Sequence, residues 1–205
     1  MKLTLQEGKA NKIHLLVDGE YRMTADREFI ALSGIKNNME LDDTELASLA
    51  EQVNSRRAFN RAADLLSRRD HSKTELLQKL RQKGFGAEAA SAAAEKMEEL
   101  GYLDDRRFAE RYAAELAQNK SFGKRRIVTE LFRKGIARDI IDEVLESLEL
   151  PEDGLHALIE RKYARSLSAE QGVRRTFNAL LRMGYAPGEI RKALREYADT
   201  TEDFE

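Results

Sequence analysis

The stretch LLQKLRQKGFGA, Leu76–Ala87, ends a helical pattern with a glycine and occurs in related form twice more in the chain. The other copies are IVTELFRKGIAR at 127–138 and FNALLRMGYAPG at 177–188. In each copy an apolar residue stands seven positions before the glycine, a leucine stands four positions before it, and an apolar residue follows it. A glycine after the last turn of a helix adopts the left-handed conformation readily, so we predict that each glycine ends a helix.

These glycines, Gly84, Gly135 and Gly184, are 51 and 49 residues apart. A fixed spacing of this size, with an amphipathic helical pattern on either side of each copy, is typical of tandem helical arrays. We therefore predict a mainly α protein built as an elongated, curved array of three-helix units. The expected units are residues 56–105, 106–153 and 154–200, preceded by a different segment at 1–55 that combines a β-hairpin with helices.

The N-terminal segment contains two runs of β-forming residues, NKIHLLV and EYRMT, on either side of Asp18-Gly19, which predicts a hairpin. DREFIALSGI reads as a short helix that Gly34 ends. A further helix begins where Asp42 and Glu45 have the spacing of a capping box. The apolar stripe of this helix changes phase near residues 54–57, and we place the boundary between the N-terminal segment and the first unit there. One continuous helix could run through this boundary.

The stretch LGYLDDRRFAERY at 100–112 joins the first two predicted units. We expect Tyr102 and Leu103 to be buried, and Asp104 or Asp105 to cap the next helix, where negative charge also suits the helix dipole. Adjacent carboxylates can instead bind a metal or share a proton. No third carboxylate or histidine stands at ligand spacing, so the structural role is favoured.

Other helix starts carry similar signals. Ser72 with Glu75 and Ser168 with Gln171 are spaced as capping boxes. Glu152 and Asp153 have the same expected role before the third unit as the aspartates before the second. Pro187 is expected in the first turn of the last helix, where its missing N–H is harmless.

Composition argues against several classes of protein. The chain has no cysteine, which excludes disulfides and thiolate chemistry and suits a reducing cytosol. Its longest apolar runs are far shorter than a membrane span requires, and no secretory signal pattern is present. His14, His71 and His156 lie in three separate segments, and no phosphate-loop or hydrolase motif occurs. We therefore expect a cytoplasmic protein that is not an enzyme and has no metal or cofactor.

The net charge of −2 conceals alternating blocks. Residues 68–83, 120–138 and 161–182 have basic excesses of four, six and five, while residues 88–105 and 139–153 have acidic excesses of five and seven. Single blocks of this kind are commonly solvated helix faces. Three in-phase basic blocks on equivalent helices instead favour a stripe that binds a polyanion such as DNA or RNA. The acidic helices would offer a second surface to a basic protein partner.

Few aromatic residues accompany the basic blocks. Phe122, Phe132 and Phe177 are the nearest, and Phe132 and Phe177 could equally belong to the core. The pattern therefore predicts contacts with the nucleic-acid backbone and not recognition of base sequence.

The segments RAADLLSRRDHSKTELLQKLRQKGF, ELGYLDDRRFAERY and FGKRRIVTELFRKGI together resemble the RecX family, over roughly residues 57–185. This resemblance implies a fold of tandem three-helix repeats and a non-enzymatic regulator in DNA repair, homologous recombination and the SOS response. RecX-like proteins bind the RecA recombinase, chiefly as its filament on single-stranded DNA, and restrain its ATPase, strand-exchange and co-protease activities. They also bind DNA themselves. The expectation that this chain inhibits RecA, and does not modulate it in another way, comes from the resemblance alone.

The predicted partners are thus RecA, its filament on single-stranded DNA and, weakly and in a salt-dependent way, DNA itself, bound by a monomer. The predicted binding residues are basic: Arg68, Arg69, Lys73, Lys79, Arg81, Lys83, Lys124, Arg125, Arg126, Arg133, Lys134, Arg174, Arg175 and Arg182. The predicted turn residues are Gly84, Asp104, Asp105, Gly135 and Gly184. We expect the second unit to dominate because its basic excess is largest. The third is expected to contribute least, because Met183 replaces the lysine that precedes the glycine in the other units.

Two other functions fit the same pattern. The chain could be a plain DNA-binding protein of helix-turn-helix-like units with no RecA partner, or a helical scaffold whose charges only confer solubility. Salt-dependent binding to single-stranded DNA separates the scaffold from the other two, and RecA dependence separates those two from each other.

Overall fold

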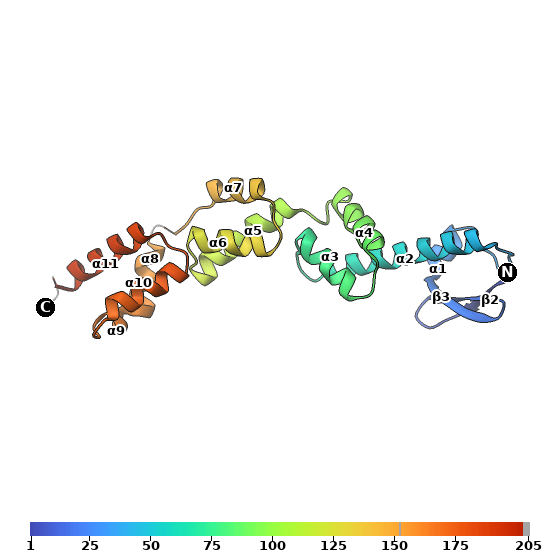
Figure 1. Cartoon of the computed structure of the whole chain (residues 1–205), viewed down its shortest axis with the longest axis horizontal. Helices are drawn as coiled ribbons and strands as arrows, with labels where there is room; N and C mark the ends of the chain where they lie inside the picture. Colours follow the sequence, from blue (N-terminus) through green and yellow to red (C-terminus); the bar gives the residue numbers. More distant parts are fainter. Residues whose placement is uncertain (152, 203–205) are drawn as a thin grey trace. The chain divides into compact units, whose positions relative to one another are not determined.

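The computed structural model describes residues 1–151 and 153–202 and is mainly α-helical, with one small sheet at the N-terminus (Figure 1). This architecture confirms the predicted fold class of three-helix units behind a small β-containing segment. Contacts divide the chain into two compact units, Met1–Leu103 and Asp104–Glu205. Within the described ranges, no helix combines the length and apolar character needed to cross a membrane.

The first unit consists of β1 (Leu3–Glu7), β2 (Lys12–Val17), β3 (Glu20–Asp26), α1 (Arg27–Leu32), α2 (Asp43–Leu66), α3 (Lys73–Gln82) and α4 (Ala87–Glu99). The second unit begins with α5 (Asp105–Lys120), α6 (Lys124–Arg133) and α7 (Arg138–Ser147). It continues with α8 (Gly154–Leu158), the π-helical segment η1 (Ile159–Tyr163), α9 (Ala164–Leu167), α10 (Gly172–Arg182) and α11 (Pro187–Glu202).

The sheet is antiparallel in the order β1-β2-β3. Asp18 and Gly19 have φ angles of 49° and 86°, which suits the two-residue turn between β2 and β3, so the predicted hairpin is confirmed. The strand β1 was not predicted. It pairs with β2, and the fully buried Leu3 at its start joins the core beneath the sheet.

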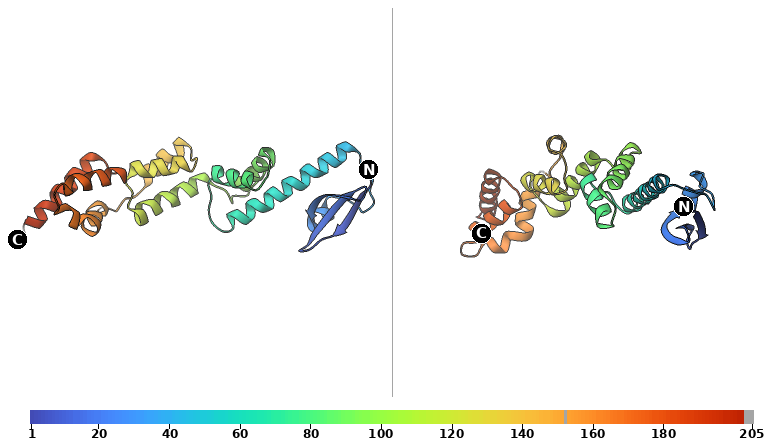
Figure 2. Two further views of the ribbon diagram at one scale, coloured as in Figure 1. Left: turned by 60° about the horizontal axis from the view of Figure 1, so that its bottom comes forward. Right: turned by 45° about the vertical axis from the view of Figure 1, so that its right-hand side comes forward.

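Helix α2 runs without interruption through the predicted boundary, and Figure 2 shows it as one long helix. Asp42 and Glu45 form the expected capping box: each side chain accepts a hydrogen bond from the other residue's backbone N–H, at 2.8 and 2.9 Å. The first half of α2 packs under the sheet through Val53, whereas the second half packs against α3 and α4 through Ala58 and Ala62.

The three middle helices, α3, α6 and α10, end in the same way. The glycines after them have φ angles of 87°, 76° and 92°: Gly84, Gly135 and Gly184. The leucines four residues before these glycines are fully buried: Leu80, Leu131 and Leu180. The N–H of the residue after each glycine donates to the carbonyl of that leucine, at 3.2, 3.2 and 3.3 Å. This reversal satisfies a carbonyl at the helix end and turns the chain toward the third helix of each repeat.

The turn between the two units caps α5. Asp104 is the N-cap residue, and its carboxylate accepts a hydrogen bond from the Arg107 N–H at 2.9 Å, while Asp105 is the first residue of the helix. Leu103 is buried, but Tyr102 is 64% exposed, so the prediction that both are buried was wrong for the tyrosine. After the chain reverses at Gly101, the leucine side chain fills the core and the tyrosine side chain points to solvent.

The other predicted helix starts differ in outcome. Ser72 accepts a hydrogen bond from the Glu75 N–H at 3.2 Å, as expected, and α11 begins at Pro187. Glu152 lies outside the described residues, and Asp153 stands at the start of α8 without a capping hydrogen bond from its side chain.

The capping box predicted at Ser168 was wrong. Ser168 ends α9, and α10 starts at Gly172 after Gln171 in the left-handed conformation. Gly172 approaches the backbone of Ser166 so closely that a Cβ atom there would lie 1.8 Å from the Ser166 carbonyl oxygen. This tight passage leaves no room for the extended N-cap geometry that a capping box needs.

Within the second unit, the start of α6 meets the turn between α10 and α11. The N–H groups of Gly123 and Arg125 donate to the carbonyls of Met183 and Gly184, at 2.8 and 3.2 Å. The unpaired amides at one helix start are thus satisfied by the carbonyls at another helix end, an arrangement that also brings opposite ends of two helix dipoles together.

The same contact excludes side chains. A Cβ atom on Gly123 would lie 2.5 Å from the Gly184 carbonyl oxygen, and one on Gly184 would lie 2.3 Å from the Arg126 nitrogen. The second and third repeats are therefore joined backbone to backbone through two glycines.

We predict that Asp104→Ala lowers the free energy of unfolding by about 1 kcal/mol, because the Arg107 amide loses its acceptor. Urea titrations followed by far-UV circular dichroism measure this loss. Asp104→Asn retains an N-cap acceptor and should remain close to the unmodified protein. Equal losses for alanine and asparagine would contradict the capping role.

We predict that Gly184→Ala is more destabilising than Gly84→Ala. Both alanines carry the cost of a left-handed conformation, about 1–2 kcal/mol. A Cβ at Gly84 meets no atom within 4 Å, whereas one at Gly184 collides with α6, which adds about 1–3 kcal/mol. The comparison is the loss of unfolding free energy in urea for the two variants. Equal losses would mean that the close approach to α6 contributes nothing to stability.

Candidate nucleic-acid interface

The predicted basic residues lie on the three equivalent middle helices and in the turns beside them. Arg68 and Arg69 precede α3, and Lys83 follows it. The block of the second repeat lies on α6 and at its end, and that of the third repeat lies on α10. Repetition of the fold thus places all three blocks on the same element of each repeat.

Half of the first block is already paired with carboxylates. Arg68 contacts Asp64 at 3.0 Å, and Arg69 contacts Glu75 at 2.6 Å. Lys73 contacts Glu98 of α4 at 2.6 Å. The other half, Lys79, Arg81 and Lys83, has no acidic partner within the described ranges.

His71 adds no positive charge to this block at neutral pH. It is almost fully buried, with Nδ1 3.3 Å from a Glu75 oxygen. Burial lowers the pKa of His71, and the charges of Arg69 and Lys79 act in the same direction, against the opposing effect of Glu75. The imidazole is therefore neutral at pH 7, and its role is to pack at the start of α3.

Ion pairs also occupy much of the second block. Arg126 and Arg133 share one carboxylate, that of Glu130, at 2.6 and 3.0 Å, and the Glu130 side chain is only 15% exposed. The Lys124 ammonium donates to the Leu145 carbonyl at 3.2 Å. Arg125 is exposed, and no acidic group pairs with it among the described residues.

Two cations of this block, one of them Arg126, also lie against aromatic rings. The Arg126 guanidinium is 5.5 Å from the centre of the Phe122 ring, and the Lys134 ammonium is 5.5 Å from that of Tyr112. Cation–π contacts of this kind hold a side chain against the protein and reduce its freedom to reach a phosphate.

The third block is the least paired of the three. Arg174, Arg175 and Arg182 are exposed, and none has an acidic partner in the described part of the chain. The order of the repeats by basic excess therefore differs from their order by the number of arginines without an acidic partner. The second repeat has the largest excess, but the third presents more arginines that are free to bind an anion.

Aromatic groups for base stacking are few, as the sequence indicates. Phe122 and Phe177 are partly buried against the cores of their repeats. Phe132 is 46% exposed and so is not a core residue, but the Arg138 guanidinium lies 5.8 Å from its ring centre.

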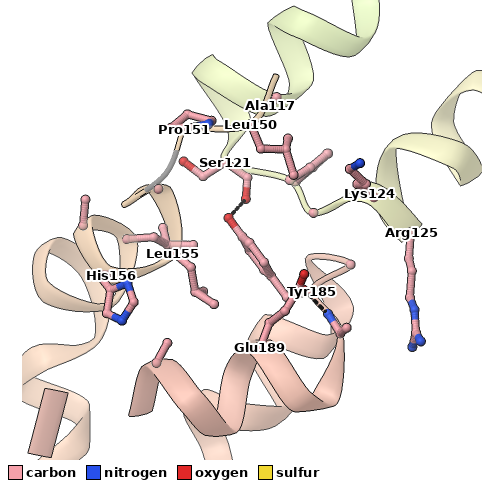
Figure 3. A pocket seen from close by; sticks show the side chains of 18 of the residues that line it. Ala117, Ser121, Lys124, Arg125, Leu150, Pro151, Leu155, His156, Tyr185 and Glu189 are labelled. Atoms are coloured by element: carbon pink, nitrogen blue, oxygen red, sulfur yellow. Dashed lines mark hydrogen bonds between the residues drawn. The ribbon is translucent and has the colours of Figure 1, made fainter. Parts of the chain in front are cut away.

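A cavity of about 640 Å³ lies beside the junction of the second and third repeats (Figure 3). Tyr185 crosses it and donates from its hydroxyl to the Ser121 carbonyl at 3.0 Å. This cavity could not be predicted from the sequence, because it depends on the contact of two glycines 61 positions apart, Gly123 and Gly184. The one local signal was Ser121-Phe122-Gly123 at a helix start where the first repeat has a capping serine.

Metal binding finds no support at the central aspartates. Among the described residues, no group of three or more histidine, aspartate and glutamate side chains could hold a metal ion. Asp104 is instead engaged with the start of α5.

Comparison with known proteins identifies the repeats. Residues 58–97 match the model of the first three-helix domain of RecX, and residues 104–145 match that of the second. The chain is 40% identical over 139 residues to a regulatory protein RecX of Trichlorobacter lovleyi, covering 64% of this chain and 89% of that one. It is 29% identical to a regulatory protein RecX of Caldanaerobacter subterraneus, over 93% of this chain and 95% of that one.

Solved structures show the same fold. A crystal structure of a regulatory protein RecX superposes with a TM-score of 0.73 at 20% identity, over 95% of this chain and 97% of the other. That of RecX from Lactobacillus salivarius gives a TM-score of 0.62 at 22% identity, over 70% and 96%. With repeat architecture, domain models and full-length relatives in agreement, the chain belongs to the RecX family of regulatory proteins.

Proposed function

We propose that the protein binds RecA and the RecA filament on single-stranded DNA and restrains its ATPase, strand-exchange and co-protease activities. It acts in the cytoplasm as a monomer, by binding and not by catalysis. RecA is the partner that membership of the RecX family implies. DNA alone is bound weakly, through phosphate contacts that depend on salt.

The observation that carries this proposal is the set of cations without acidic partners on equivalent helices. In the described residues these are Lys79, Arg81 and Lys83 with α3, Arg125 on α6, and Arg174, Arg175 and Arg182 on α10. A guanidinium or ammonium that is not already paired gives up no internal contact when it binds a phosphate. Repetition on three equivalent helices favours a partner that repeats its charge, as a nucleic-acid backbone does.

The acidic third helices supply a second surface for a protein partner. On α7, Asp142 pairs with Arg138 and Glu143 pairs with Arg106. Asp139 and Glu146 of the same helix are exposed, without a basic partner in the described ranges. A basic segment of RecA would complement this face.

We predict that Arg174→Ala with Arg175→Ala flattens the salt dependence of binding to single-stranded DNA by about 1.4 in log–log slope, which is about 0.7 for each lost phosphate contact. Alanine preserves the helix, so α10 should remain folded. The measurement is fluorescence anisotropy of a labelled oligothymidylate, titrated at several salt concentrations. ATPase activity of RecA on single-stranded DNA, with the protein at substoichiometric amounts, is measured in parallel.

The matched control removes two arginines that are paired in the same unit, Arg133→Ala with Arg138→Ala. It should flatten the slope by less than half as much, because these guanidinium groups would have to leave their carboxylates to reach phosphate. If both variants keep the salt dependence of the unmodified protein, the basic helices are only a solvated surface. DNA binding without any effect on the RecA ATPase would favour the plain DNA-binding alternative.

A further inference from the structure

The cavity between the second and third repeats has an apolar interior. Ala117 from α5, Leu150 and Pro151 from the connecting segment, Leu155 from α8 and Ala193 from α11 line it. Its volume of about 640 Å³ lies within the range of small-molecule and side-chain binding sites, about 300–1,000 Å³. An apolar lining of this size favours an occupant that brings an apolar group.

The rim of the cavity is basic. Among the described lining residues there are four cations, Lys124, Arg125, Arg161 and Lys192, and one carboxylate, Glu189. Lys192 also lies 3.7 Å from Glu196, at an exposed position. The Glu189 carboxylate is engaged, because it accepts a hydrogen bond from the Ala186 N–H at 2.8 Å at the start of α11. The rim therefore favours a negatively charged occupant.

Arg161 occupies an unusual position on this rim. It lies on the π-helical segment η1, and no carboxylate pairs with it in the described part of the chain. Single π-helical turns within α-helices occur frequently at functional sites, because the wider turn reorients side chains.

Contacts within the protein hold the cavity open. The hydrogen bond from Tyr185 to the Ser121 carbonyl ties the third repeat to the second across it (Figure 3). Burial raises the pKa of Tyr185, as does the charge of Glu189, so the hydroxyl keeps the proton that it donates. A cavity that exists before binding requires little reorganisation by its ligand.

The aromatic groups of the lining are already engaged. Phe122 lies against the Arg126 guanidinium, the His156 ring nitrogen is 2.8 Å from Glu196, and Tyr185 is bonded to Ser121. The Phe122 ring face therefore carries a cation, and the hydrogen bonds fix the orientation of the other two rings, so no aromatic ring of the described lining is free to turn onto a nucleobase. The apolar walls and basic rim thus fit a peptide better than a nucleotide.

We propose that this cavity binds an acidic peptide segment of a protein partner, with an apolar side chain in the interior and flanking carboxylates on Arg161 and Lys192. The proposal rests on the proposed function, which requires a protein partner. Its two proposed carboxylate-binding residues, Arg161 and Lys192, lie on η1 and α11 and not on a middle helix, although Lys124 and Arg125 of α6 share the rim.

The test uses the full chain and a fluorescein-labelled peptide that has one leucine between two pairs of glutamates. Anisotropy should show binding that weakens about tenfold or more when serine replaces the leucine, because the cavity loses its apolar occupant. Arg161→Ala with Lys192→Ala should weaken binding about three- to tenfold, the range expected for two partly exposed ion pairs.

Two further variants make the outcome specific. Arg165→Ala with Arg195→Ala removes two exposed arginines of the same unit that do not line the cavity, and should leave peptide binding unchanged. Ala157→Trp adds a large side chain at an exposed lining position and should reduce binding without disturbing the core. Equal losses in the two arginine variants, or no binding of the peptide to the unmodified chain, would overturn the proposal.

Competition with unlabelled oligothymidylate distinguishes the two kinds of polyanion. If the oligonucleotide displaces the peptide, and Arg161→Ala with Lys192→Ala weakens DNA binding equally, the cavity is a nucleic-acid site and the proposal is wrong. Parallel RecA ATPase assays keep the two proposals separable. Restraint of the ATPase without peptide binding would reject the cavity site alone, whereas peptide binding without restraint would reject the proposed function alone.

Discussion

A left-handed glycine that follows a buried leucine determines the form of every repeat. The reversal at Gly84, Gly135 and Gly184 returns the next N–H to the carbonyl of the leucine, whose side chain fills the core. Six residues, from the leucine to the residue after the glycine, thus set the end of the helix, the direction of the third helix and the position of the core. In the third repeat the reversal has an additional role, because the carbonyls of Met183 and Gly184 also satisfy the amides at the start of α6.

Features that depend on a few neighbouring residues could be predicted from the sequence. The hairpin at Asp18-Gly19 and the capping box of Asp42 with Glu45 are of this kind. Features that depend on distant segments could not. Strand β1 is held by pairing with β2 and by the bond from the Leu3 N–H to the Met39 carbonyl, and Ser168 failed as a cap because Gly172 packs against Ser166.

The candidate site shows the same division between local and distant information. Helical periodicity was enough to place basic residues on the middle helices. Whether these residues are available to bind a phosphate depends on which carboxylates reach them. The mostly buried carboxylate of Glu130, for example, pairs with both Arg126 and Arg133. A count of charges gives Arg126 and Arg133 the same weight as Arg174 and Arg175. Of these four, only Arg174 and Arg175 have no acidic partner among the described residues. Pairing lowers the gain that a phosphate contact can bring.

The continuity of α2 has a consequence for how the first unit folds. Val53 belongs to the core beneath the sheet and Ala58 to the core of the first repeat, with no loop between them. If either core were lost, about 12 residues of α2 would stand in water, a length at which an isolated helix is marginally stable. Each core therefore supports the helix that the other requires. The sheet and the first repeat should form a single cooperative folding unit, in which local opening of one lowers the protection of backbone amides in the other.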